Sequence, residues 1–155
     1  MSAPYTPGKV AALAAEIDAA VRALPLCDTP HVRAVRREYS RGLKNAPESW
    51  IRALAGELVQ HYGQRDMAYE LVRYHPGAFA ALGEAELEAL GQGMASWGAV
   101  DSFARILAGP AWLCGQVNDA LIARWARSEN LWWRRAALVS TVALNVRSCG
   151  GRGDV

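Results

Sequence analysis

Apolar residues recur every three to four positions along most of the chain, and no segment alternates with a period of two. This pattern predicts a chain of helices without strands. Proline, glycine and short polar breaks separate the expected helices. These cover residues 9–24, 30–44, 47–62, 64–74, 76–82, 84–91, 97–108, 112–127 and 130–146. Gly109-Pro110 is expected to be a break, and residues 148–155 a C-terminal loop or tail.

Short helices joined by short connections favour antiparallel helix pairs packed side by side, either as a compact bundle or as a curved array. Periodicity alone does not choose between these two arrangements, because the sequence shows no sharp internal repeat. A length of 155 residues fits one domain, which we place at residues 1–147.

Composition narrows the class of protein further. Hydrophobic residues make up 52% of the chain and 29 residues are alanine, so the chain is expected to fold and to favour helix. No apolar run approaches the roughly 18 residues that span a bilayer, and no secretion signal is visible, so no membrane association is expected. Three widely spaced cysteines predict a cytoplasmic protein, and neither they nor the histidines show metal-ligand spacing. A net charge of +2 does not require a polyanionic partner.

The expected helix after Ser96 carries polar and aromatic residues at the edge of its apolar face. Trp97, Asp101 and Arg105 follow one another at four-residue steps. One interpretation is an edge tryptophan beside an exposed Asp101–Arg105 ion pair, which stabilises a helix by only about 0.2–0.5 kcal/mol. The other is an aromatic face and a carboxylate that project together into a groove.

The expected helix 130–146 has an arginine, Arg135, near the centre of its apolar stripe. The stripe consists of Leu131, Leu138, Val139, Val142 and Val146. Arginine is rarely buried without a partner, because removing its charge from water is costly. Arg135 is therefore expected either to pair with a core carboxylate or to face a groove, and both alternatives require an acidic or anionic partner.

Helix 30–44 is expected to have a basic face. Arg33, Arg37, Arg41 and Lys44 lie opposite its apolar residues. Such a face is usually solvated, and it becomes a candidate for phosphate binding if it lines the same surface as Arg135.

Two segments carry a resemblance to a known family. SWGAVDSFARIL from Ser96 and ARWARSENLWWRRAALVSTVALN from Ala123 resemble the AlkD-like DNA alkylation repair family of helical-repeat DNA glycosylases. The pattern is W-x-x-x-D followed by W-x-x-S-x-N-x-W-x-x-R. TPHVRAVRREY from Thr29 and the helix around Met67–Tyr74 also match, so the resemblance covers nearly the whole chain.

The resemblance implies an all-α fold of HEAT-like repeats that form a curved superhelix around duplex DNA. Its members hydrolyse the N-glycosidic bond of cationic N3- and N7-alkylpurines without a metal or cofactor. The family's catalytic tryptophan and aspartate correspond to Trp97 and Asp101, and its groove-lining arginine corresponds to Arg135. The usual asparagine before the tryptophan is Ser96 here, which can still cap the helix. On this view Arg33, Arg37 and Arg105 are candidate DNA contacts.

Family members continue into further helices after a loop that resembles NVRSCGGRGD from Asn145. We therefore expect a truncated array, which is either a fragment of a longer protein or a natural short form. In a short form the last helix would leave an apolar face uncovered, which favours dimerisation or aggregation. The leading hypothesis is an alkylpurine DNA glycosylase. The alternatives are a DNA-binding scaffold without catalysis and a helical-repeat adaptor that binds other proteins.

Overall fold

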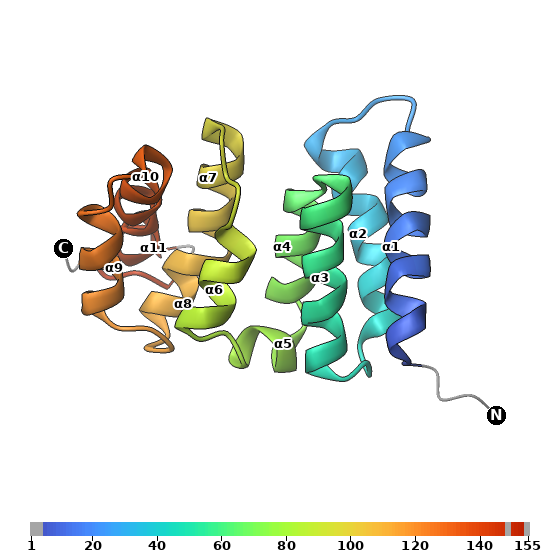
Figure 1. The fold of residues 1–155 in the computed structure, drawn as a ribbon, viewed down its shortest axis with the longest axis horizontal. Coiled ribbons are helices and arrows are strands. Elements are labelled where there is room, and N and C mark those ends of the chain that lie inside the picture. Colours follow the sequence, from blue (N-terminus) through green and yellow to red (C-terminus); the bar gives the residue numbers. More distant parts are fainter. Residues whose placement is uncertain (1–4, 148–149, 154–155) are drawn as a thin grey trace. The chain divides into compact units, whose positions relative to one another are not determined.

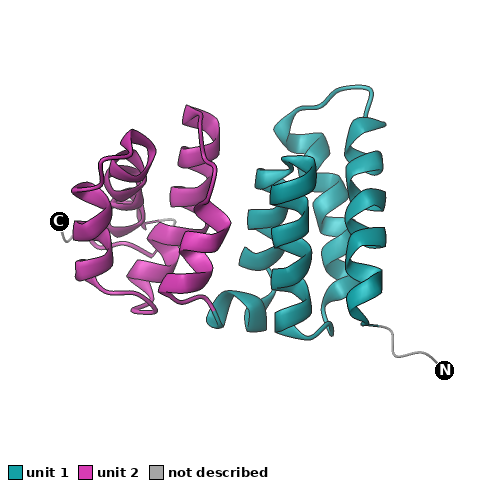
Figure 2. Ribbon diagram, in the orientation of Figure 1, with its two compact units in different colours: residues 1–81 teal, residues 82–155 magenta. Residues whose placement is uncertain are grey.

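The computed structural model describes residues 5–147 and 150–153. The described residues form helices joined by short turns, with no strand among them (Figure 1). This confirms the all-α fold predicted from periodicity. The chain divides into two compact units, Met1–Ala81 and Leu82–Val155 (Figure 2). The single domain at 1–147 and the HEAT-like repeat stay predictions.

The first unit contains five helices among its described residues. They are α1 (Pro7–Arg22), α2 (Thr29–Leu43), α3 (Glu48–Tyr62), α4 (Arg65–Arg73) and α5 (Pro76–Ala80). Helix α3 packs against α1 and α4, and α2 packs against α4 (Figure 1). The largest side chains buried between them are Ile17, Ile51, Leu54, Leu58, Met67, Tyr69 and Val72. These positions recur at helical spacing, which is why periodicity located this unit's helices closely.

The second unit is built around one helix, α10. Its elements are α6 (Glu84–Gly91), α7 (Trp97–Phe103), the π-helical turn η1 (Ala104–Ala108), α8 (Gly109–Leu113), α9 (Asp119–Ala126), α10 (Leu131–Ser140) and α11 (Val142–Asn145). Helix α10 packs against α7, η1, α8, α9 and α11. The packing of α10 therefore fixes the position of its side chains relative to those of α7.

The predicted break at Gly109-Pro110 and the predicted helix 112–127 are wrong. The chain stays helical through Pro110, because the π turn lets the Gly109 N–H donate to the Ala104 carbonyl, five residues back, instead of four. The wider turn accommodates a proline that has no N–H to donate. The real break lies at Gly115, whose φ of +74° ends α8. Asn118 then begins α9 by accepting the N–H of Leu121.

The predicted apolar stripe of α10 is also wrong in its orientation. Leu131 and Leu138 are exposed, and the buried positions are small residues. These are Ala136, Ala137 and Ser140 in α10, followed by Ala143 in α11. Small side chains let α10 approach η1 and α8 closely, and hydrophobic periodicity underweights alanine and serine relative to leucine and valine.

An aromatic cluster and an ion pair connect α6, α7, α9 and α10. The rings of Phe103, Trp125 and Trp133 have centroids 4.9–5.9 Å apart. Glu88 accepts hydrogen bonds from Trp125 Nε1 at 2.9 Å and from Arg124 Nη2 at 2.6 Å. Burial raises the pKa of Glu88, but these two hydrogen bonds outweigh it and hold the pKa below its usual value.

The C-terminal loop lies only partly within the described residues. Residues 150–153 form a non-helical turn in which the Gly151 and Gly153 N–H groups donate to the Val146 and Leu144 carbonyls. Residues 148–149 and 154–155 of the predicted loop lie outside the described residues. None of the described helices combines the length and the apolar character that crossing a membrane requires.

Gly109 is expected to be essential for the close packing of α10. A Cβ at this position would lie 2.7 Å from the Ser140 carbonyl oxygen, which belongs to the backbone and cannot rotate away. Gly109→Ala should therefore lower the free energy of unfolding by about 1–3 kcal/mol in urea denaturation. Gly98→Ala, also helical but with no neighbour within 4 Å, is the control and should not destabilise the fold. Equal stability of the two variants would contradict this account of the packing.

The Glu88 carboxylate should make stability depend on pH. Because its folded pKa lies below its unfolded value, its contribution is present above the unfolded pKa of 4.5 and is lost as the pH falls through the folded pKa. Glu88→Gln should therefore melt below the wild type at pH 7, and the two melting temperatures should converge by about pH 3. The exposed Glu129, changed to Gln, should show no such convergence. A difference in melting temperature between the wild type and Glu88→Gln that does not change with pH would contradict the role given to the Glu88 carboxylate.

Candidate functional site

The first two turns of α7 present Trp97 and Asp101. The Ser96 hydroxyl accepts the Ala99 N–H at 3.2 Å, so Ser96 caps the helix as predicted. Trp97 is the first helical residue and its side chain is largely exposed. Asp101 follows one turn later, on the same side of the helix. Burial of Val100 and Phe103 in the core fixes this orientation.

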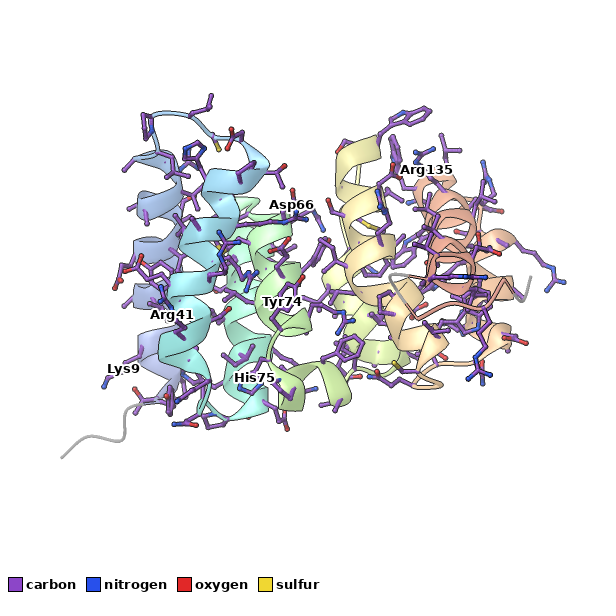
Figure 3. All side chains as sticks on the ribbon, turned by 180° about the vertical axis from the view of Figure 1, so that it is seen from behind. Lys9, Arg41, Asp66, Tyr74, His75 and Arg135 are labelled. Atoms are coloured by element: carbon purple, nitrogen blue, oxygen red, sulfur yellow. The ribbon has the colours of Figure 1, made fainter. Side chains whose placement is uncertain are left out.

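Arg135 lies in the second turn of α10. Asn130 begins this helix by accepting the Trp132 N–H at 2.8 Å. The neighbouring Ala136 and Ala137 are buried, which leaves Arg135 at the edge of the interface that α10 forms with α7. The long arginine side chain can then reach across to the first turns of α7 (Figure 3).

The structure brings Trp97, Asp101 and Arg135 together. Arg135 Nε donates to Asp101 Oδ1 and Arg135 Nη2 donates to Asp101 Oδ2, both at 2.9 Å. The Arg135 Cζ atom lies 3.9 Å from the centre of the Trp97 ring. One guanidinium group thus makes a bidentate ion pair through its edge and a cation–π contact through its face. We call this arrangement the Arg135 site.

The Arg135 site is accessible to solvent and to a ligand. The side chains of Asp101 and Arg135 are 39% and 24% exposed. Asp101 provides the acidic partner that the position of Arg135 required, although it is a partly exposed carboxylate and not a core one. An arginine has five N–H donors, and Asp101 accepts from only two of them. The outer edge of the guanidinium can therefore still bind an anion.

The Asp101–Arg105 ion pair, one of the two interpretations of this helix, does not form. Asp101 pairs instead with Arg135, which occupies both carboxylate oxygens from α10. Arg105 lies in the π-helical turn η1 and is exposed. It has no ion pair within the part of the chain that the structure describes.

The other two predicted DNA contacts, Arg33 and Arg37, lie on α2 in the first unit. Arg33 donates from Nε to Glu70 Oε1 at 2.8 Å, whereas Arg37 is exposed without an ion pair among the described residues. Sequence reasoning missed Glu70 and Arg36, which are both buried and hydrogen-bonded to each other at 3.1 Å. The available signal was Glu70 itself, a charged residue within the apolar helix 64–74.

A hollow in this unit is lined by none of the three residues of the Arg135 site. It has a volume of about 540 Å³ between α6, α9 and α10. Its lining includes Glu88, Arg124, Arg127, Trp125 and Trp133. None of the predicted site residues lines it, and sequence reasoning did not single it out. No group of three or more histidine, cysteine or acidic side chains among the described residues could hold a metal ion.

Comparison with known proteins identifies the family. The model of the family described as DNA alkylation repair enzyme matches residues 22–150, which include all the elements of the Arg135 site. No curated protein and no solved structure matched the chain. The match covers most of the chain, and its span contains Trp97, Asp101 and Arg135. This chain is therefore a member of the DNA alkylation repair enzyme family.

Proposed function

We propose that this protein is a DNA glycosylase that hydrolyses the N-glycosidic bond of cationic N3- and N7-alkylpurines in duplex DNA. Membership of the DNA alkylation repair family supports a role in alkylation repair and an interaction with DNA. The glycosylase activity itself is inferred from the Arg135 site, where one arginine holds a carboxylate and a tryptophan side by side.

Asp101 is proposed to stabilise the charge that develops on the sugar. When the C1′–N bond of a cationic base breaks, the base leaves with both bonding electrons and becomes neutral, so it needs no prior protonation. The sugar is left as an oxocarbenium-like species, which a nearby carboxylate stabilises. A water molecule adds its oxygen to C1′ and loses its proton to Asp101 or to solvent. Each Asp101 oxygen keeps lone-pair capacity beyond its bond to Arg135.

Trp97 is proposed to attract the positively charged base. One face of its ring is stacked on Arg135, while the side chain is 67% exposed and can offer its other surface to a ligand. A cation over an aromatic face typically gains about 0.5–2 kcal/mol. An alkylated purine carries this positive charge and an unmodified purine does not, so the contact favours the damaged base.

Arg135 is proposed to bind a backbone phosphate with its outer edge while its inner edge holds Asp101. Phosphate contacts fix the register of a protein on DNA, so this contact would place the sugar next to the carboxylate. Arg105, one turn beyond Asp101 and exposed, is proposed as a further phosphate contact. Arg37 is proposed to add to the nonspecific attraction of DNA from the first unit.

The exposed leucines of α10 form the apolar face through which the expected dimer would form. Leu131 and Leu138 lie one turn to either side of Arg135 and share its face of the helix. A second chain seated on this face would cover the Arg135 site. Dimerisation through this face and DNA binding at Arg135 are therefore mutually exclusive, and we propose that the active form is a monomer.

Asp101→Asn should abolish most of the base release. The amide keeps the shape of the side chain but removes the negative charge, so release of 7-methylguanine from methylated duplex DNA should fall by about 10²–10³-fold in single-turnover assays. Asp119→Asn makes the same change in α9, at a carboxylate that accepts a hydrogen bond from Trp112 and lies outside the Arg135 site, and should keep the wild-type rate. A wild-type rate for Asp101→Asn would refute the proposed role. Salt-dependent DNA binding with intact alkylated bases would instead favour the non-catalytic scaffold.

The substitution Arg135→Lys tests whether the planar guanidinium group, and not its charge alone, positions Asp101 and Trp97. Lysine keeps the charge but can neither bind Asp101 at two points nor stack flat on Trp97. The rate of base release at saturating DNA should fall by about 10- to 100-fold, because both groups lose their fixed position. The adjacent Arg134 is exposed and donates to the Ser128 and Glu129 carbonyls, so Arg134→Lys is the matched control. Equal rates for the two variants would show that charge alone is needed.

A further inference from the structure

The first unit contains a second arginine that is bound by a carboxylate and stacked on an exposed ring. Arg36 donates from Nε to Glu70 Oε2 at 3.1 Å, and its Cζ atom lies 4.1 Å from the centre of the Tyr74 ring. Arg135 makes the same two kinds of contact, with Asp101 and Trp97. A third arginine–aromatic contact, Arg73 over Phe79, has no carboxylate bonded to its arginine among the described residues.

A second arginine, Arg33, shares the same carboxylate. Its Nε donates to Glu70 Oε1 at 2.8 Å, so the two guanidinium groups bind one oxygen each. The Glu70 side chain is only 7% exposed, whereas that of Arg33 is 51% exposed. The hydrogen bond to Glu70 raises the pKa of Arg33, which therefore stays charged. Arg33 bonds to Glu70 through one of its five donors, and its side chain reaches solvent.

A purely structural role explains Arg36 better than it explains Arg33. Arg36 is buried and neutralises the buried Glu70, which would otherwise be an uncompensated charge. A second cation on the same carboxylate adds a surplus positive charge at the surface. Arg33 and Arg37 are neighbours on exposed positions of α2, and the Asp66 carboxylate is a further acidic group that acts on Arg33. The three arginines, Arg33, Arg36 and Arg37, therefore outnumber the carboxylates of Glu70 and Asp66 by one positive charge.

Tyr74 adds an apolar surface beside this charge. Tyr74 caps the C-terminal end of α4 and is 57% exposed (Figure 3). Arg36 covers one face of its ring. Exposed aromatic rings of this kind can stack on the sugars and bases of nucleic acids, while guanidinium groups bind the phosphates. A phosphodiester with its adjoining deoxyribose presents this combination of an anion and an apolar face.

We propose that Arg33 and Tyr74 form a second DNA-backbone contact, in which Arg33 binds a phosphate and the free face of Tyr74 packs on the neighbouring deoxyribose. This inference rests on the proposed function only in taking DNA as the ligand. Glu70 and Arg36 act as positioning residues: Glu70 aims the Arg33 guanidinium, and Arg36 holds the Tyr74 ring. The contact supplies affinity and plays no part in breaking the glycosidic bond.

The test measures binding of an unmodified fluorescent duplex at several salt concentrations, which is independent of catalysis. Arg33→Gln should weaken binding about tenfold and lower the slope of log K against log salt by about 0.9, the value for one phosphate contact. Tyr74→Leu should weaken binding about fivefold with an unchanged slope, and Tyr74→Phe should restore wild-type affinity. Lys9→Gln removes one exposed charge of the same unit and is the control.

Two results would overturn this inference. The first is that Arg33→Gln weakens DNA binding no more than Lys9→Gln does. The second is that Tyr74→Leu binds DNA like the wild type. In both cases the variant must keep the wild-type melting temperature. Failure of the proposed glycosylase would look different: the wild type would release no alkylated base, while Arg33→Gln and Tyr74→Leu would still weaken binding to the duplex.

Discussion

The candidate site depends on the guanidinium of Arg135. Its edge binds both oxygens of Asp101 and its face lies on the ring of Trp97, so a single group fixes two side chains that are themselves partly exposed. The rest of the second unit serves to hold α10 beside α7. Small residues and Gly109 allow the close approach, and the Phe103–Trp125–Trp133 cluster fills the space between the helices. Packing far from the chemistry therefore sets the geometry of the charged groups.

Arginine is suited to this role because its two binding modes are perpendicular. Carboxylates and phosphates meet the planar fork at its edge, while aromatic rings meet it face-on. Arg135 and Arg36 each use both modes. The two arginines differ in burial, and that difference separates their proposed roles. Arg135 keeps donors at the surface for a ligand, whereas Arg36 is enclosed and leaves the ligand contact to Arg33 and Tyr74.

Periodicity and resemblance predicted the helices of the first unit and the three residues of the Arg135 site. The contacts themselves could not be predicted, because Asp101 and Arg135 are 34 residues apart, as are Arg36 and Glu70. Local patterns carry no information on which helices meet. The Asp101–Arg105 pair, one of the two interpretations of this helix, does not form, because that interpretation considered only neighbours on one helix. The π turn before Pro110 was missed because sequence rules treat Gly-Pro as an end of helix.

The central claim is that Arg135 holds Asp101 and Trp97 at one site, and nuclear magnetic resonance of the arginine Nε–H groups tests it most directly. The signal of Arg135, assigned by its loss in Arg135→Lys, should be displaced from those of exposed arginines by the Trp97 ring and by its hydrogen bond to Asp101. Both Trp97→Leu and Asp101→Asn should move it towards the exposed position. An Arg135 signal at the exposed position, unmoved by either substitution, would contradict the account.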